Sequence, residues 1–441
     1  MNDKKSQITR VGCFMSIGKI IYYHRKKQHK TQEQLCHGIC SVSHLSRIEN
    51  NFKEANTKTL QLLCERLHIS IEEENKKTQL LKRQLELFYD AMERLQKEKA
   101  AALYKELLEH KEYVQCTEMI YLYELYMLRY LLFLDRFSEF EEVSSKMKKD
   151  VAKYSSFEAY VWDFLQAIYY GHKQQYVQSL EILNRLEDKA VQYSEKITDY
   201  YYYRAATHGL LYQYSLSLHY ANKALRVLQD TNNILRIVHV KIIIAVNLIY
   251  IGKFERADQM LVLVLSDAEL LRNTDMKAIA LHNLGFLYHR QGNFQKMLEY
   301  FSKSLDLKQK YTLSYYVTVS SFAEALTEFN EHEKAAALLK QELDSFQDRK
   351  SPMYVEQKIL YLEALGDKKT LVQYLIKHGL PTLERRMHFR RAIKYLDMIT
   401  AYYKEKKDLT SVNHYLLASN RILKNALHNI GNPVTLENLR L

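Results

Sequence analysis

Residues 281–304 have the sequence LHNLGFLYHRQGNFQKMLEYFSKS, and this stretch decides the fold. Large apolar residues recur at helical spacing on both sides of Gly292-Asn293, which predicts two helices joined by a tight turn. The small Gly285 in the first predicted helix lets the second helix approach closely. A hairpin of this size cannot bury its own apolar face, so further copies must stack against it.

The same spacing recurs along most of the chain. A small or apolar residue starts each predicted second helix, at Phe140, Ser179, Ser217, Ala257, Met297, Ala335, Leu371 and Val412. Successive positions lie 36 to 41 residues apart, which is typical of two-helix solenoid repeats. The spacing therefore predicts about 8–9 stacked hairpins over residues 95–441.

Composition favours an all-α protein that stays in the cytoplasm. Only 3 Pro and 11 Gly occur in 441 residues, whereas helix-forming residues recur throughout. The most apolar segment, residues 231–251, is interrupted by Arg236, His239 and Lys241, so it predicts buried helices and no membrane span. Residues 1–10 are polar and lack the apolar core of a signal peptide.

The N-terminal region has a different pattern, with four short predicted helices. Thr31 is a good N-cap, and Gln34 three residues later completes a capping box. Gly38 breaks this second helix, and a third opens at Ser41 or Ser43. Residues 1–70 contain 12 Lys and Arg against 5 Asp and Glu, so much of the chain's net charge of +12 lies here. This location favours an anionic partner.

These patterns divide the chain into four parts. Residues 1–14 are expected to be a flexible arm, 15–71 a DNA-binding domain, 72–94 a linker helix and 95–441 the repeat domain. The linker carries an apolar stripe of Leu80, Leu81, Leu85, Leu87 and Phe88. We expect a homodimer or higher homo-oligomer, with contacts from the linker helix, the C-terminal repeats, or both.

The span from Thr31 to Ser70 resembles XRE/Cro-type helix-turn-helix domains, through TQEQL, SVSHLSRIEN and LCERLHIS. The connection around residues 38–40 is one residue longer than the common pattern, which leaves the start of the third helix open by one position. The resemblance implies that Thr31 and Gln32 contact phosphates, and that the third helix enters the major groove of a double-stranded operator. Its implied groove residues are Ser41, Ser43, His44 and Arg47. The alternative is a four-helix module that binds protein.

Residues 95–430 resemble tetratricopeptide (TPR) repeats, most closely at residues 281–304. Together with the N-terminal domain, this predicts an all-α fold in which a helix-turn-helix precedes a right-handed TPR-type α-solenoid. TPR arrays bind extended peptides on their concave face, and Asn283 is the first choice for a peptide-backbone clamp, because an amide both donates and accepts. The implied inward residues are Tyr202, Tyr203, Asn247, His282, Asn283, Phe286, His289 and Glu324. Core packing is the alternative for the aromatic residues, and a helix-helix contact is the alternative for Asn283.

This order of domains resembles the Rap–Rgg–NprR–PlcR–PrgX family of peptide-pheromone receptors from Gram-positive bacteria, and its NprR-type members most. The resemblance implies quorum sensing, in which a secreted and re-imported oligopeptide binds the TPR domain and controls DNA binding by a dimer. It also implies that a peptide-free form binds a sporulation phosphorelay protein. The alternative function is therefore a TPR scaffold that sequesters such a partner.

Catalytic and metal-binding functions are not expected. The chain has no glycine-rich phosphate loop, GxSxG elbow or HExxH motif, and a Rap-type phosphatase would carry a three-helix bundle in place of the helix-turn-helix. No cofactor is predicted. Cys36, Cys40 and Cys64, with His37 and His44, suggest a zinc site, but Cys36 and Cys64 fall at inward positions. All five cysteines (13, 36, 40, 64 and 116) are therefore predicted to be small buried apolar groups and not bridges.

Overall fold

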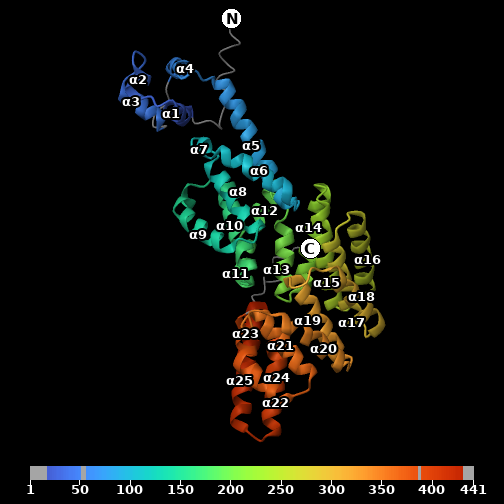
Figure 1. The fold of residues 1–441 in the computed structure, drawn as a ribbon. Helices are drawn as coiled ribbons and strands as arrows, with labels where there is room; N and C mark the ends of the chain where they lie inside the picture. Colours follow the sequence, from blue (N-terminus) through green and yellow to red (C-terminus); the bar gives the residue numbers. More distant parts are fainter. Residues whose placement is uncertain (1–16, 51–55, 386–388, 431–441) are drawn as a thin grey trace. The chain divides into compact units, whose positions relative to one another are not determined.

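The structure is a computed structural model, and it describes residues 17–50, 56–385 and 389–430 (Figure 1). All regular secondary structure in these residues is helical, which confirms the all-α prediction. The chain divides into two compact units. Unit 1 comprises residues 1–169 and 186–193, and unit 2 comprises residues 170–185 and 194–441. The predicted arm at residues 1–14, with Cys13, lies outside the described residues.

Unit 1 begins with the helix-turn-helix domain. Its helices are α1 (Ile17–Lys27), α2 (Gln32–Cys36), α3 (Val42–Glu49) and α4 (Thr57–Arg66). The predicted capping box at Thr31 and Gln34 is present in full. Gly38 has a φ of 71°, a left-handed conformation that glycine adopts at little cost, and α2 ends just before it. Ser41 caps α3, which fixes the start of the third helix at Val42.

A small apolar core holds these four helices together. It contains Ile21, Leu35, Leu45, Ile48 and Leu63, with Cys36, Cys64 and Leu67. Burial raises the pKa of the Cys64 thiol to about 11, so the thiol stays protonated at neutral pH. The prediction of buried cysteines is confirmed for Cys36 and Cys64, but Cys40 and Cys116 are only half-buried.

The long helix α5 (Ile71–Glu93) leaves this domain and packs against the helices that follow it (Figure 1). Leu81, Leu85 and Phe88 are buried at helical spacing, whereas Leu80 and Leu87 are 60% and 38% exposed. The five residues of the predicted stripe therefore lie on two faces of one helix, because consecutive residues of an α-helix point about 100° apart. The rest of unit 1 comprises α6 (Lys97–Glu109), α7 (Lys111–Val114), α8 (Ile120–Phe133), α9 (Phe137–Met147), the 3₁₀ helix η1 (Lys148–Lys153), most of α10 (Ser156–His172), and α12 (Glu187–Gln192).

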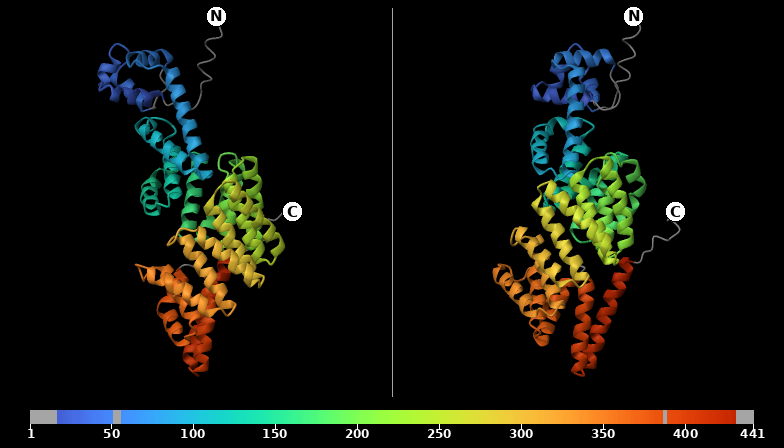
Figure 2. Two further views of the ribbon diagram at one scale, coloured as in Figure 1. Left: turned by 45° about the vertical axis from the view of Figure 1, so that its right-hand side comes forward. Right: turned by 90° about the vertical axis from the view of Figure 1, so that its right-hand side faces the viewer.

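Unit 2 is built mainly from helices that pack against their neighbours in sequence order, as Figure 2 shows for the segments coloured from yellow-green to red. These helices are α11 (Tyr176–Arg185), α13 (Tyr200–Leu210), α14 (Tyr214–Asp230), α15 (Ile234–Tyr250), α16 (Phe254–Leu270), α17 (Thr274–Arg290), α18 (Phe294–Leu307), α19 (Leu313–Glu328), α20 (His332–Ser345), α21 (Pro352–Ala364), α22 (Lys368–Tyr374), the π-helical η2 (Leu375–Gly379), α23 (Leu380–Arg385), α24 (Phe389–Glu405) and α25 (Leu409–Ile430).

The repeat spacing seen in the sequence is confirmed to the residue. Each of the eight positions from Phe140 to Val412 is the fourth residue of a second helix, in α9, α11, α14, α16, α18, α20, α22 and α25. All but Val412 are buried. The fourth residue faces the partner helix because the first turn of the second helix is where the two helices approach each other.

Gly285 lies where α17 and α18 approach each other closely. A Cβ atom on Gly285 would lie 2.8 Å from two atoms of the Phe301 ring, closer than real contacts allow. The predicted close packing of the 281–304 hairpin is therefore confirmed. The apolar segment 231–251 forms α15, and no helix in the described part of the chain has both the length and the apolar composition to span a membrane.

Candidate nucleic-acid interface and ligand groove

The first candidate surface lies on α3. Ser41, Ser43 and Arg47 are exposed, and Ser43 and Arg47 stand one helical turn apart. The Ser41 hydroxyl accepts a hydrogen bond from the backbone N–H of His44 (3.2 Å) and lies 3.1 Å from the Ser43 hydroxyl. Among the described residues, the Arg47 guanidinium has no hydrogen bond or ion pair. Its five donors are therefore available to a partner.

The other predicted interface residues occupy different environments. Thr31 is exposed and caps α2, whereas Gln32 is half-buried and its amide donates to Glu49 Oε2 at 2.7 Å. His44 is half-buried and turned partly toward the domain. Val42 is 43% exposed at the first position of α3 and was not predicted. A methyl-bearing residue there could contact the thymine methyl group, but an isolated Val in a helical pattern carries no signal of its own.

A buried ion pair orients the helices behind this surface. Arg25 of α1 donates to both carboxylate oxygens of Glu49 at 2.6 and 2.9 Å, and to the Lys30 carbonyl at 2.9 Å. The hydrogen bond to Glu49 raises the Arg25 pKa, although burial opposes it. Because Gln32 also binds Glu49, one carboxylate fixes α1, α2 and α3 relative to each other. The sequence patterns did not reveal this pair, whose partners are 24 residues apart.

A second polar cluster joins the helix-turn-helix domain to the rest of unit 1. Glu74 of α5 lies 3.0 Å from His24 Nε2 and accepts a hydrogen bond from the Tyr113 hydroxyl at 2.6 Å. Tyr113 in α7 also contacts the Thr78 hydroxyl, and Lys77 Nζ lies 3.7 Å from the centre of its ring. Burial opposes ionisation of Glu74, but the hydrogen bonds from His24 and Tyr113 outweigh it and lower the Glu74 pKa. The first helix is thereby tied to α5 and α7.

Unit 2 contains the second candidate site, a groove of about 580 Å³. This volume lies within the usual range for a ligand site. Its walls come from α13, α15, α17, α19, α21 and α24, and from Tyr212 just beyond the end of α13, so six helical hairpins contribute. The lining residues are Leu210, Tyr212, Tyr250, Phe286, His289, Arg290, Val317, Ser320, Ser321, Glu324, Glu328, Met353, Glu356, Arg390 and Arg391.

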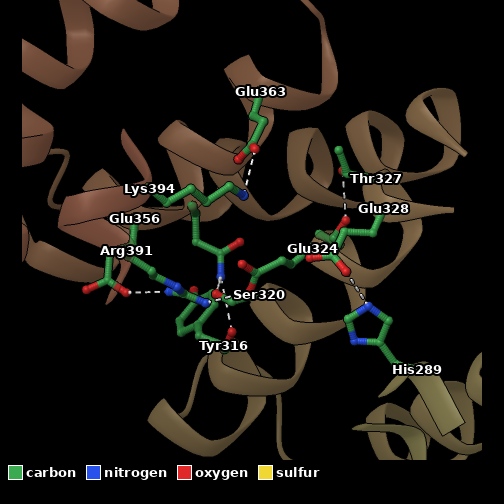
Figure 3. Close-up of polar contacts among 12 residues, drawn as sticks. His289, Tyr316, Ser320, Glu324, Thr327, Glu328, Glu356, Glu363, Arg391 and Lys394 are labelled. Carbon is green, nitrogen blue, oxygen red and sulfur yellow. Dashed lines mark hydrogen bonds and ion pairs between the residues drawn. The ribbon is translucent and has the colours of Figure 1, made fainter. Parts of the chain in front are cut away.

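Ion pairs connect helices of distant repeats whose residues line this groove (Figure 3). Arg391 of α24 donates to Glu324 of α19 at 3.0 Å and to Glu356 of α21 at 3.3 Å. Burial opposes the charge on Arg391, but the two carboxylates raise its pKa. His289 Nε2 lies 2.8 Å from Glu328 Oε2. These contacts hold α17, α19, α21 and α24 around a common space.

Aromatic rings and arginines also line the groove. Tyr250 stacks on Tyr214 with ring centres 4.6 Å apart, and Phe286 lies 5.5 Å from Tyr250. The Arg390 guanidinium lies over the Tyr212 and Tyr250 rings at 5.8 and 5.7 Å. Such cation–π contacts orient a guanidinium without occupying its hydrogen-bond donors.

Three of the eight predicted inward residues line this groove: Phe286, His289 and Glu324. Asn247 and Asn283 are buried, and their amides donate to the carbonyls four residues earlier, Ile243 and Ile279. His282 lies 3.0 Å from the Thr318 hydroxyl, and burial lowers its pKa to about 3. Tyr202 and Tyr203 pack against the Arg236 guanidinium instead of lining the groove.

The groove residues that were not predicted include Tyr212, Tyr250, Arg290, Arg390 and Arg391. Tyr212 follows the end of α13, outside the helical pattern, and Tyr250 is the last residue of α15. The arginine pair at 390–391 belongs to α24, where the repeat pattern is weak. Arginines at the start of α24 lie about 100 residues beyond α17 in the sequence, so no local pattern indicates that both helices line one groove.

Comparison with known proteins agrees with both halves of this structure. Residues 21–73 match the helix-turn-helix family and residues 276–348 match the tetratricopeptide repeat family. The chain is 25% identical over 417 residues to the transcriptional activator NprA of Geobacillus stearothermophilus, covering 89% of this chain and 99% of that protein. In both domains and in their order, the chain is similar to these regulators. Its relative RapD of Bacillus subtilis (strain 168) is 27% identical over 52% of this chain and 65% of that protein.

Solved structures share the fold of this chain. The apo form of the quorum sensor NprR from B. thuringiensis superimposes with a TM-score of 0.63 and 22% identity, covering 78% of this chain and 99% of that one. A Rap protein bound to competence and sporulation factor gives a TM-score of 0.66 and 17% identity, covering 80% and 99%. These likenesses establish a shared TPR-like helical architecture.

Proposed function

We propose that the chain is a transcription regulator whose helix-turn-helix domain binds double-stranded DNA and whose TPR array binds a small signalling oligopeptide that controls DNA binding. The observation that carries the proposal is the exposed face of α3, where Ser43 and Arg47 lie on a domain whose helices are joined by the Arg25–Glu49 ion pair. The likeness to the transcriptional activator NprA, which extends over nearly the whole of that protein, supports the proposal. The protein acts by binding rather than by catalysis, and works in the cytoplasm.

Replacing Arg47 with alanine should weaken DNA binding by about 1–3 kcal/mol, because the exposed guanidinium reaches a base or phosphate. The probe is a set of duplexes that the full-length protein selects from a randomised pool, measured by fluorescence anisotropy at several salt concentrations. Gln32→Ala should weaken binding to all sequences alike. Arg226→Ala, an exposed arginine of α14, is the charge-matched control and should change little.

Unchanged affinity in Arg47→Ala would contradict the α3 interface. Specific binding that survives deletion of residues 1–70 would contradict the assignment of the whole domain. A steep fall of affinity with salt is expected as well, since phosphate contacts release counterions from DNA. A scaffold that only sequesters protein would show no selected duplex and no such dependence.

The peptide site in this proposal is the groove of unit 2. Phe286, His289 and Glu324 belong to the predicted set. The tyrosines and arginines that line the same groove complete the proposed site. Apolar walls with a few fixed polar groups are the usual composition of a peptide site. A structure of NprR in complex with its cognate peptide NprX shares this fold, with a TM-score of 0.64 and 23% identity.

We infer that two copies of the chain associate. Large apolar side chains are exposed on α5, at Leu80 and Leu87, and on α25, at Leu416 and Leu417. Exposed apolar residues on long helices favour contacts between copies, and a dimer would read two half-sites. Light scattering should give twice the monomer mass at micromolar concentration. A strict monomer, both with and without the selected duplex, would contradict this inference.

Sequestration of a phosphorelay protein is the second candidate function. It is favoured by the likeness to RapD and to response regulator aspartate phosphatase E of Bacillus subtilis (strain 168), the latter 26% identical over 38% of this chain and 46% of that protein. In this reading the peptide-free array holds the partner, and peptide binding releases it.

A further inference from the structure

The charges that line the groove of unit 2 are not all neutralised within it. Three carboxylates, Glu324, Glu328 and Glu356, face three arginines, Arg290, Arg390 and Arg391. Arg391 binds both Glu324 and Glu356, and Glu328 contacts His289. Within the described residues, Arg290 and Arg390 therefore have no carboxylate partner, although both line the groove and are exposed.

The two arginines act on the same tyrosines. The Arg390 guanidinium lies over the Tyr212 and Tyr250 rings, at 5.8 and 5.7 Å from their centres. Burial raises the pKa of Tyr214 to about 12, and the positive charges of Arg390 and Arg290 oppose that rise. Both charges also act on Tyr250, which stacks on Tyr214. The guanidiniums thus converge on one wall, although Arg290 is in α17 and Arg390 in α24.

We propose that this arginine–tyrosine wall (Arg290, Arg390, Tyr212 and Tyr250) binds a carboxylate of the oligopeptide that occupies the groove. The assignment rests on the proposed peptide-binding function and names the chemistry that the ligand must carry. A guanidinium presents a planar fork of donors that matches a carboxylate, and two forks can take both oxygens. The tyrosine rings exclude water from one side of the pair, which strengthens the attraction.

The carboxylates that line the groove restrict how a peptide can bind there. Glu324 and Glu328 would repel a ligand carboxylate, and they would favour an ammonium or an amide donor. A peptide therefore avoids like-charge contact when its carboxylate lies at the arginine–tyrosine wall and away from these two glutamates. The carboxylate can be the C-terminus of the peptide or an Asp or Glu side chain, and both have the same hydrogen-bonding chemistry.

The test exposes immobilised full-length protein to two randomised hexapeptide pools, one with free C-termini and one with C-terminal amides, and identifies retained peptides by mass spectrometry. If the C-terminus binds, the amide pool is lost. If a side chain binds, the amide pool is retained with Asp or Glu enriched at a fixed position. Either result supports the proposal when Arg390→Gln lowers retention of those peptides about tenfold or more.

Controls separate this proposal from simple loss of charge or of fold. Arg226→Gln removes an exposed arginine of α14 outside the groove and should leave retention unchanged. Arg390→Lys keeps the charge without the planar fork and should give an intermediate loss. Melting curves of the variants should match the wild type, because Arg390 is exposed.

Two results would overturn the proposal, and they differ in what else they overturn. Peptides retained with no preference for a carboxylate, or retained equally by Arg390→Gln, would remove the carboxylate site and leave peptide binding standing. A wild-type protein that retains no peptide from either pool would contradict the proposed function and the carboxylate site together.

Discussion

Replacing Arg25 with methionine should lower the unfolding free energy of the helix-turn-helix domain by roughly 3–5 kcal/mol, because it leaves the buried Glu49 carboxylate without its cation. Both side chains of the pair are less than a tenth exposed, so water cannot replace the lost contact. Hydrogen exchange of α1 to α3 in the full-length protein measures this change in the domain itself. Protection there should fall while protection in unit 2 stays the same.

Two further variants show that the pair, and not the volume of the side chain, is responsible. The double change Arg25→Met with Glu49→Leu should recover most of the lost protection, since an apolar pair has no charge to desolvate. Arg47→Met, in the same domain but exposed, should leave protection unchanged. Normal protection in Arg25→Met alone would show that Glu49 is solvated and that the ion pair does not hold the three helices.

Replacing Gly285 with alanine should destabilise unit 2 by about 1–3 kcal/mol, because the new methyl group would lie 2.8 Å from the Phe301 ring. The expected measurement is a lower melting temperature. Peptide affinity should fall with it, since α17 also carries Phe286, His289 and Arg290. Shifting α17 away from α18 would displace all three groove residues.

The chain offers a matched control for this prediction. A Cβ on Gly171 would lie 3.7 Å from the Ser179 hydroxyl, an ordinary contact, so Gly171→Ala should be neutral or stabilising by up to about 1 kcal/mol. Adding Phe301→Leu to Gly285→Ala should restore part of the lost stability by making room for the methyl group. An unchanged melting temperature in Gly285→Ala would contradict the close approach of α17 and α18.

The repeat architecture could be predicted from sequence because its signals are local. A small or apolar residue at the fourth position of each second helix recurs every 36 to 41 residues, and the cap at Thr31 needs only its nearest neighbours. The buried Cys36 and Cys64 followed from the same helical spacing. Helix periodicity therefore defined the elements, their order and most of the apolar core.

The groove could not be predicted to the same extent because it depends on contacts between distant repeats. Arg391 meets Glu324, 67 residues away, and neither residue is part of the apolar pattern. Asn283 lies on the same stripe of α17 as Phe286, but one turn earlier, where it is buried and its amide is bound to the Ile279 carbonyl. The resemblance pointed to α17, which contributes Phe286 and His289 to the groove, whereas exposure along that helix is set by the packing of its neighbours.

The central claim, that peptide in the TPR groove controls DNA binding, is tested most directly by titrating the selected duplex with full-length protein, with and without a saturating peptide recovered from the hexapeptide pools. Coupling free energies between sites are typically about 1–3 kcal/mol, so the peptide should change the Kd for DNA by about 5- to 150-fold. For a variant with Arg390→Gln, half of the peptide's effect on the Kd for DNA should require about tenfold more peptide than for the wild type. An identical Kd with and without bound peptide would contradict the account, because two sites without coupling cannot form a peptide-responsive regulator.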